Sequence, residues 1–233
     1  MTESATATGY PGRKLPPPTF FDPSFERVPV AADFDDAHPG PVILLYDPAA
    51  DRRWVADAAI ALATGWTSGG RRTVLADLSL EDPLLHERIG MGNMEGIVDI
   101  FLYGASLARS ARPVPGRGFY LITAGTYTDD AGAIFRHPRW EKIVAGFREA
   151  QASLLLFVPT DAPDLLSVGH WAEDVIVLGA HDDEELLRSV LLQGFSVRAW
   201  LTPPVPGGAP AAPPPPSPAA RFPDPEPVPP WKA

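Results

Sequence analysis

Residues 41–63 read PVILLYDPAADRRWVADAAIALA. Residues 41–47 form a short apolar run typical of a buried strand, whereas residues 51–66 are rich in alanine and predict a helix. A strand, a turn and a helix in this order open many parallel α/β sheets. Where such a unit holds a phosphate group, its turn is rich in glycine. Here the turn, residues 47–53, contains no glycine.

The same alternation continues along the chain. Apolar runs predict further strands at 71–78, 118–125, 153–159, 174–179 and 195–201, and helical patterns lie at 82–90, 96–104, 137–151, 164–173 and 182–194. Strands that are continuously apolar are typical of a mostly parallel sheet with helices on both faces. Ligand sites in such sheets lie at the carboxyl ends of strands. The segments to inspect are therefore 47–53, 77–82, 125–130 and 159–163.

Proline marks out the domain organisation. Of the 29 prolines, 7 lie in residues 1–40, 13 in residues 204–233 and only 9 between them. We therefore expect one α/β domain over residues 41–203 between two proline-rich arms, 1–40 and 204–233. The first arm is either an extended segment held to the domain through Phe20, Phe21 and Phe25 or a disordered leader.

Charge and composition exclude several functions. The net charge is −10, of which −7 falls in residues 41–203, so non-specific binding to nucleic acid and docking on an anionic membrane are not expected. Without cysteine there is no thiolate catalysis and no Cys-ligated zinc, and no pair of histidines has metal-ligand spacing. No apolar run is long enough to insert into a membrane, and no secretory signal is evident, so we expect a cytoplasmic protein.

Residues 69–104 read GGRRTVLADLSLEDPLLHERIGMGNMEGIVDIFLYG. This stretch resembles the cytoplasmic P-loop ATPases of bacterial polysaccharide synthesis and export, the tyrosine autokinases, which are relatives of the MinD/ParA group. The residues that carry the resemblance are Arg72, Leu75, Asp77, Leu80, Pro83, Leu85, His86, Asn93, Gly96 and Gly104. The resemblance covers about residues 41–203. It implies a P-loop NTPase-like three-layer fold.

The first turn departs from this family. Its pattern is G-x-G-K-[ST], and counting back from residues 61–63 places Ala50, Asp51, Arg52 and Arg53 on the Gly-Lys-Ser-Thr positions. Asp51 then brings a negative charge to where the lysine meets the phosphates. At about 4 Å and an effective dielectric constant near 20, such a like-charge contact costs roughly 4 kcal/mol per unit charge. We therefore expect no nucleotide at this turn.

The acidic positions also depart from the family. Ser79 stands at the second aspartate of the D-A-D pair, and Phe157 stands at the aspartate that ends the Walker B strand. Asp77 alone remains of the three acids, so a Mg²⁺ site is not expected. No tyrosine follows Tyr127, so the phosphoacceptor cluster of the family's kinases is absent too. We predict a pseudoenzyme without cofactor or metal.

The resemblance implies a binding or scaffold subunit in exopolysaccharide or capsule synthesis and export. Its partner would be a membrane protein that controls polysaccharide chain length or export, which would place the chain at the inner face of the membrane. Two alternatives remain: a MinD/ParA-like spatial regulator or accessory subunit, and a divergent enzyme that uses Arg52, Arg53 and Asp77 on a phosphorylated ligand.

The second arm carries the candidate partner-binding residues. The run Pro213, Pro214, Pro215 and Pro216 either binds an aromatic groove or acts as a spacer. Trp231 lies where no core can bury it, so it is either a docking anchor or part of a loose terminus.

Overall fold

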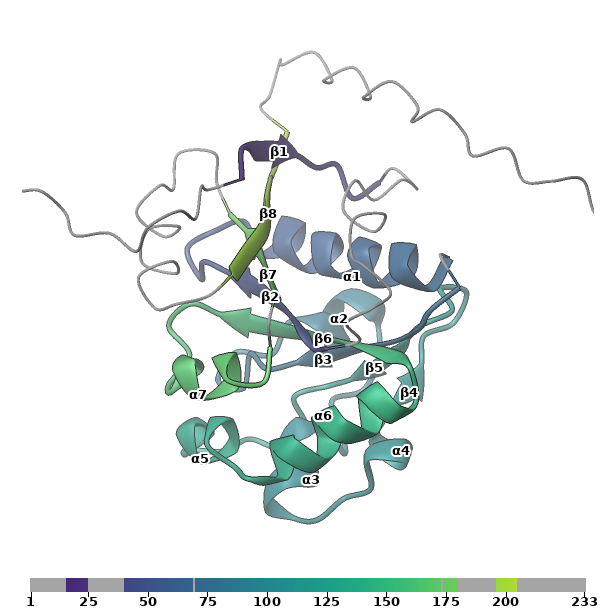
Figure 1. Ribbon diagram of the computed structural model, residues 1–233, viewed down its shortest axis with the longest axis vertical. Helices are drawn as coiled ribbons and strands as arrows, with labels where there is room; N and C mark the ends of the chain where they lie inside the picture. The colour runs from purple at the N-terminus through teal and green to yellow at the C-terminus, as the bar shows by residue number, and fades with distance from the viewer. Residues whose placement is uncertain (1–15, 25–39, 69, 173, 180–195, 205–233) are drawn as a thin grey trace, which may run out of the picture.

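The computed structural model describes residues 16–24, 40–68, 70–172, 174–179 and 196–204. Within these ranges the strands form one sheet in the order β1-β8-β7-β2-β6-β3-β5-β4 (Figure 1). The strands are β1 (Pro18–Phe20), β2 (Val42–Tyr46), β3 (Arg72–Asp77), β4 (Arg112–Pro113), β5 (Tyr120–Ile122), β6 (Ala152–Pro159), β7 (Asp174–Leu178) and β8 (Ser196–Thr202). Neighbours run parallel except for β4 and β5. The predicted mostly parallel α/β sheet is confirmed.

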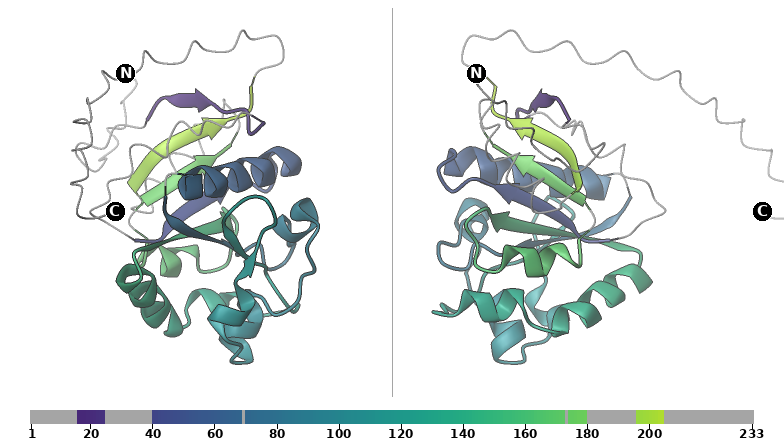
Figure 2. Two further views of the ribbon diagram at one scale, coloured as in Figure 1. Left: turned by 90° about the vertical axis from the view of Figure 1, so that its right-hand side faces the viewer. Right: turned by 60° about the vertical axis from the view of Figure 1, so that its left-hand side comes forward.

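Helices cover both faces of this sheet (Figures 1 and 2). On one face lie α1 (Arg52–Ser68) and α2 (Leu85–Ile89), and on the other lie α3 (Ile97–Leu102), α5 (Ala131–Phe135), α6 (Arg139–Glu149) and α7 (Leu165–Gly169), with the short α4 (Leu107–Ser110) beside α3. Successive side chains of a strand point to opposite faces, and helices cover both faces of this sheet. The central strands therefore carry apolar side chains on both sides. In β2, for example, Leu44 packs on the face covered by α1, whereas Ile43 and Leu45 pack on the face covered by α3, α5, α6 and α7.

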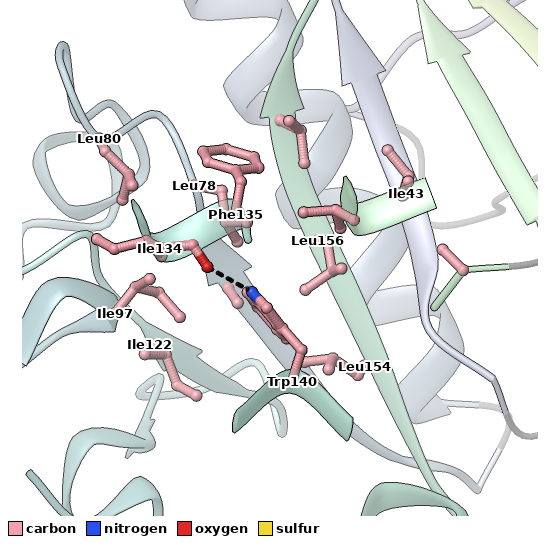
Figure 3. Close-up of a cluster of buried hydrophobic side chains, with 14 of the residues drawn as sticks. Ile43, Leu78, Leu80, Ile97, Ile122, Ile134, Phe135, Trp140, Leu154 and Leu156 are labelled. Carbon is pink, nitrogen blue, oxygen red and sulfur yellow. Dashed lines mark hydrogen bonds between the residues drawn. The ribbon is translucent and has the colours of Figure 1, made fainter. Parts of the chain in front are cut away.

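The core on the α6 face is built around Trp140 (Figure 3). Its indole Nε1 donates a hydrogen bond to the carbonyl oxygen of Ile134, at 2.9 Å. The four apolar positions that define the predicted helical face, Trp140, Ile143, Val144 and Phe147, are all buried. The amphipathic pattern therefore identified both the helix and its buried face.

Part of the first arm joins the sheet as its edge strand. β1 pairs with the end of β8, and the N–H group of Phe21 donates to the carbonyl oxygen of Thr202 at 2.8 Å. The Phe21 side chain is buried, and its carbonyl oxygen accepts a hydrogen bond from Trp54 Nε1 at 3.0 Å. Phe20 is 44% exposed, and Phe25 lies outside the described residues. Residues 18–21 are therefore held to the domain, which agrees with the first of the two predictions for this arm.

Several elements differ from the sequence-based expectation. The helix expected at 82–90 begins only at Leu85, so Pro83 precedes its N-cap, Leu84, rather than lying in its first turn. The helix expected at 164–173 is the single turn α7. The helix expected at 182–194 lies outside the described residues. Among the helices whose positions are described, none combines the length and apolarity of a membrane span.

Candidate functional site

A hollow opens at the carboxyl ends of β2, β3 and β6, the edge of the sheet where the sequence predicted a ligand site. This carboxyl-edge hollow has a volume of about 160 Å³. It is lined by Tyr46 and Pro48 after β2, Arg52 of α1, residues 78–82 after β3, Ala131 and Phe135 of α5, and residues 159 and 161–163 after β6. Three of the four segments predicted for a ligand site therefore meet in one place. Residues 125–130 do not line the hollow.

The turn between β2 and α1 uses its own backbone N–H groups. Ala49 donates to the Asp47 carboxylate at 2.8 Å, and Ala50 donates to the Asp47 carbonyl at 2.9 Å. Asp51 caps α1: its carboxylate accepts from the N–H groups of Arg53 and Trp54, at 2.9 and 3.1 Å. A loop that holds phosphate directs such N–H groups at its ligand. Here, two of them bond to Asp47 within the turn, and two at the start of α1 bond to Asp51.

Replacing Asp51 by alanine is expected to lower the free energy of unfolding by about 1 kcal/mol, because the first turn of α1 loses its side-chain acceptor. The Asp51→Asn variant keeps an acceptor oxygen and should stay within a few tenths of a kcal/mol of the parent. Urea denaturation followed by circular dichroism measures both values. Equal stability of the alanine and asparagine variants would contradict this role of Asp51.

The charges around the hollow are mainly negative. Arg52 forms a two-bond ion pair with Asp82, in which Nη2 and Oδ1 lie 3.0 Å apart. Glu81 and Asp161 make no ion pair with another described residue, so one cation faces three carboxylates. A nucleoside triphosphate needs the opposite arrangement, since lysine, arginine and Mg²⁺ neutralise its phosphates. The residues at this edge do not fit such a ligand.

Beneath the hollow, Ser79 and Phe157, the residues aligned above with acidic positions of the family, are packed into the core. The ring of Phe157 stacks on that of Tyr46, with centroids 4.3 Å apart and planes 11° from parallel. The Tyr46 hydroxyl donates to Ser79 Oγ at 2.9 Å. Phe157 has no exposed surface, and Ser79 is 2% exposed. The space at the Phe157 position is therefore filled by two stacked rings.

Asp77 is fully buried at the end of β3. Its Oδ1 accepts from the N–H of Ser79 at 3.0 Å, and its Oδ2 accepts from those of Leu84 and Leu85 at 3.2 and 2.9 Å. Burial raises the pKa of Asp77 above its ordinary value, although these hydrogen bonds oppose the shift. Burial likewise raises the pKa of Tyr46 to about 12. Asp77 thus holds the segment before α2 to the sheet.

The raised pKa of Asp77 predicts a pH effect on stability. Above the ordinary value of 3.8 the unfolded chain loses this proton first, so the folded chain binds more protons and its unfolding free energy falls as the pH rises. The fall is about 1.4 kcal/mol per pH unit and stops above the folded-state pKa. Asp77→Asn removes this contribution. The free energy of unfolding, measured by urea denaturation from pH 4 to pH 8, should fall for the wild type relative to Asp77→Asn. The difference between the wild type and Glu149→Gln should stay constant over the same range.

Residues 93–99 of the motif have a structural role at the end of β5. Asn93 exchanges two hydrogen bonds with the backbone of Gly125, at 3.0 and 2.8 Å. The Asp99 carboxylate accepts from the N–H groups of Gly96 and Thr126, at 2.8 and 3.0 Å. Partial burial opposes ionisation of Asp99, but the hydrogen bonds from Thr126 and Gly96 lower its pKa. The motif therefore joins α3 to β5.

The structure brings together most of the residues that sequence reasoning selected. Ala50, Asp51, Arg52 and Arg53 form the turn and the start of α1, and Asp77, Ser79 and Phe157 lie beneath it. Arg53 is exposed and does not line the hollow. The tail candidates, Pro213, Pro214, Pro215, Pro216 and Trp231, lie outside the described residues. Among residues with described positions, no group of three or more His, Asp or Glu side chains could hold a metal ion.

Sequence reasoning missed Tyr46, Asp47 and Asp82. Tyr46 was read only as the end of an apolar strand, yet its hydroxyl bonds Ser79 and its ring packs on Phe157. The Asp-Pro pair at 47–48 was an available signal for Asp47, because aspartate often starts a turn by bonding the backbone two residues on. No sequence signal pairs Arg52 with Asp82 across 30 residues.

Comparison with known proteins was made by sequence and by structure. No protein-family model and no curated protein matches the chain. Among solved structures, the kinase domain of Escherichia coli tyrosine kinase ETK matches with a TM-score of 0.64 and 13% identity, covering 78% of this chain and 73% of that one. The VpsO kinase domain matches with a TM-score of 0.64 and 16% identity, over 76% and 90% of the two chains.

A cell-division ATPase also has this architecture. MinD from Pyrococcus furiosus matches with a TM-score of 0.55 and 11% identity, over 71% of this chain and 72% of that one. These similarities concern the fold, and both groups are those that the motif at residues 69–104 resembles. The chain therefore has the α/β fold shared by bacterial tyrosine kinase domains and MinD-like ATPases.

Proposed function

We propose that the chain is a non-catalytic subunit that binds other proteins through the carboxyl edge of its sheet. The observation that carries this proposal is the turn between β2 and α1, where Asp47 accepts from the N–H groups of Ala49 and Ala50, and Asp51 accepts from those of Arg53 and Trp54 at the start of α1. Phosphoryl transfer depends on positioning and charge neutralisation. A turn that bonds four of its N–H groups internally and carries two carboxylates supports a role other than phosphoryl transfer.

Calorimetric titration with ATP and Mg²⁺ up to millimolar nucleotide tests this proposal. We expect no heat of binding for the wild-type chain, and a magnesium-dependent isotherm would overturn the proposal. Asp51→Lys restores the missing charge but leaves Ala49 and Ala50 bonded to Asp47. This variant should therefore also fail to bind ATP. That result would show that the bonded N–H groups of the turn, and not only the missing lysine, prevent binding.

The pathway is proposed from the resemblance of residues 69–104 and from the tyrosine kinase domains among the structural neighbours. We place the chain in exopolysaccharide or capsule synthesis and export, with a membrane chain-length or export protein as partner. Co-purification of the chain with that protein from cells that make the polysaccharide tests this assignment. Recovery of the partner should depend on the chain, and a partner that fractionates independently of it would contradict the assignment.

A second candidate is a spatial regulator of the MinD type that recruits partners without hydrolysis. The structural match to Pyrococcus furiosus MinD favours it. Localisation of a fluorescent fusion separates the two candidates. A signal that follows the polysaccharide export machinery supports the first, whereas a pole-to-pole or mid-cell pattern that persists without that machinery supports the second.

A further inference from the structure

The loops at the carboxyl edge of the sheet share a charge pattern. The loops that follow β2, β3, β5 and β6 include residues 47–51, 78–84, 126–130 and 160–164. Each of these four segments contains two acidic residues and neither lysine nor arginine. Nearby, Arg52 pairs with Asp82. Arg136 pairs with Asp130 and Asp164. The edge therefore has more carboxylates than cations.

The hollow at this edge suits a guanidinium group. Glu81 and Asp161 are exposed at its rim, and neither makes an ion pair with another residue of described position. The hollow volume of about 160 Å³ is close to that of an engineered cavity of about 150 Å³ that admits benzene. A guanidinium group is planar and has fewer heavy atoms than benzene, and its N–H donors match carboxylate oxygens. An arginine side chain therefore fits both the size and the charge of the hollow.

Exposed apolar side chains gather beside the same edge. Among the described residues, seven large apolar or tyrosine side chains are exposed, and four of them form what we call the α3 patch: Met94, Leu102, Tyr103 and Tyr127. Met94 and Tyr127 are each 74% exposed. Asp99 of α3 binds Thr126, the residue before Tyr127. Leu102 and Tyr103 lie three and four positions after Asp99, and so on the same side of the helix.

The α3 patch reaches the end of β5, close to the hollow. Asn93 exchanges two hydrogen bonds with the backbone of Gly125. Met94 is the next residue after Asn93, and Tyr127 lies two residues after Gly125. Ala131, the first residue of α5, lines the hollow. It follows Tyr127 by four residues, so their backbones are at most about 14 Å apart.

The charges indicate which class of molecule fits this surface. Its carboxylates would repel the phosphates of nucleic acid and of anionic lipid. A second copy in a symmetric contact would bring the same acidic loops together, which like-charge repulsion opposes. Tyrosine, methionine and arginine are the side chains enriched where proteins bind each other. The complementary molecule is therefore another protein that presents positive charge.

We propose that the carboxyl edge binds a basic segment of another protein, with an arginine of that segment in the hollow beside Glu81 and Asp161 and an apolar side chain against the α3 patch. This inference rests on the proposed function, because it names the chemistry of the partner that the non-catalytic subunit binds. The guanidinium group forms charge-assisted hydrogen bonds with the carboxylates. Attraction between the two surfaces speeds their encounter and weakens as salt is added.

A synthetic peptide tests this surface in the full chain. The probe is acetyl-Trp-Gly-Arg-Gly-Trp-amide, and its control carries citrulline, which has nearly the same shape as arginine but no charge. Two-dimensional proton–nitrogen NMR spectra at low salt give both the affinity and the residues that respond. We expect saturable binding with a dissociation constant on the order of 1 mM or lower, and at least about 10-fold weaker binding of the citrulline peptide. The largest shifts should fall in residues 78–82, 126–131 and 160–163.

Matched substitutions identify the groups involved. Asp161→Lys should weaken binding of the arginine peptide at least about 10-fold. Glu149→Lys makes the same charge change at an exposed position at the opposite edge of the sheet, where α6 leads into β6, and should alter binding less than about threefold. Tyr127→Ser should weaken binding at least about threefold, whereas Tyr120→Ser, at the start of β5, should leave it unchanged.

Several outcomes would overturn the proposal. They are equal affinities of the arginine and citrulline peptides, equal effects of Asp161→Lys and Glu149→Lys, and no saturable binding up to about 5 mM peptide. Sedimentation of the chain without peptide examines self-association. Dimers that Asp161→Lys abolishes would assign the edge to a second copy and also overturn the proposal. An ATP isotherm would overturn the proposed function, whereas loss of peptide binding alone would overturn this inference, so the two fail separately.

Discussion

Replacing Phe157 by aspartate is expected to lower the free energy of unfolding by at least about 5 kcal/mol and to leave little folded protein. The side chain has no exposed surface and stacks on Tyr46. The substitution removes a buried ring and introduces a carboxylate next to Asp77, with which Phe157 is in register. Urea denaturation should show a transition displaced to very low denaturant, or none.

Phe157→Leu is the matched control. It keeps an apolar side chain and should cost roughly 1–2 kcal/mol, since only part of the ring volume is lost. If Phe157→Asp folds as stably as Phe157→Leu, the position tolerates a charge and the packed arrangement beneath the hollow is wrong. We therefore expect that a single acid at position 157 does not create a metal site, because the residues around it pack against the Tyr46–Phe157 ring pair.

Gly96→Ala is expected to lower the free energy of unfolding by about 3 kcal/mol. A Cβ atom at this position would lie 2.1 Å from the carbonyl oxygen of Thr123 and 2.3 Å from the nitrogen of Gly125. Both contacts are with backbone, so α3 has to move away from β5 and weaken the hydrogen bond from Ile97 N–H to Thr123. Equilibrium denaturation in urea gives the loss directly.

Gly146→Ala provides the opposite expectation. Gly146 lies inside α6, and a Cβ atom there would meet nothing within 4 Å. Alanine has the higher helix propensity, so this variant should gain about 0.5–1 kcal/mol. Equal effects of the two substitutions would mean that Gly96 is not required for close approach of α3 to the sheet.

The central sheet could be predicted from sequence because its strands are buried on both faces and so read as unbroken apolar runs. β1 could not, because its three residues pair only with β8, 182 residues away in the chain. The sequence analysis did not predict α5, although Asp130 is an N-cap residue whose side chain accepts from the N–H of Ala133 at 2.9 Å. Short elements depend on tertiary contacts that local patterns do not record.

The candidate site was predicted in outline. Comparison with the family pattern selected Asp51, Ser79 and Phe157, and the structure places all three at the carboxyl edge of the sheet. What the replacements do depends on side-chain hydrogen bonds: Asp51 caps a helix and Asp77 binds three N–H groups. Residue identity alone does not show whether an acid repels a phosphate ligand or accepts hydrogen bonds from the backbone N–H groups that such a ligand would use.

The position of β1 has a consequence for solubility. A parallel sheet that ended at β8 would present an open row of backbone donors and acceptors, which is a template for pairing with another molecule. β1 occupies the end of that row, with Phe21 N–H bonded to Thr202. Pro18 in this strand has no N–H group to offer a further strand. β1 therefore covers the Trp200–Thr202 end of that edge, and a recombinant domain that begins at residue 41 would leave this end of β8 open to another chain.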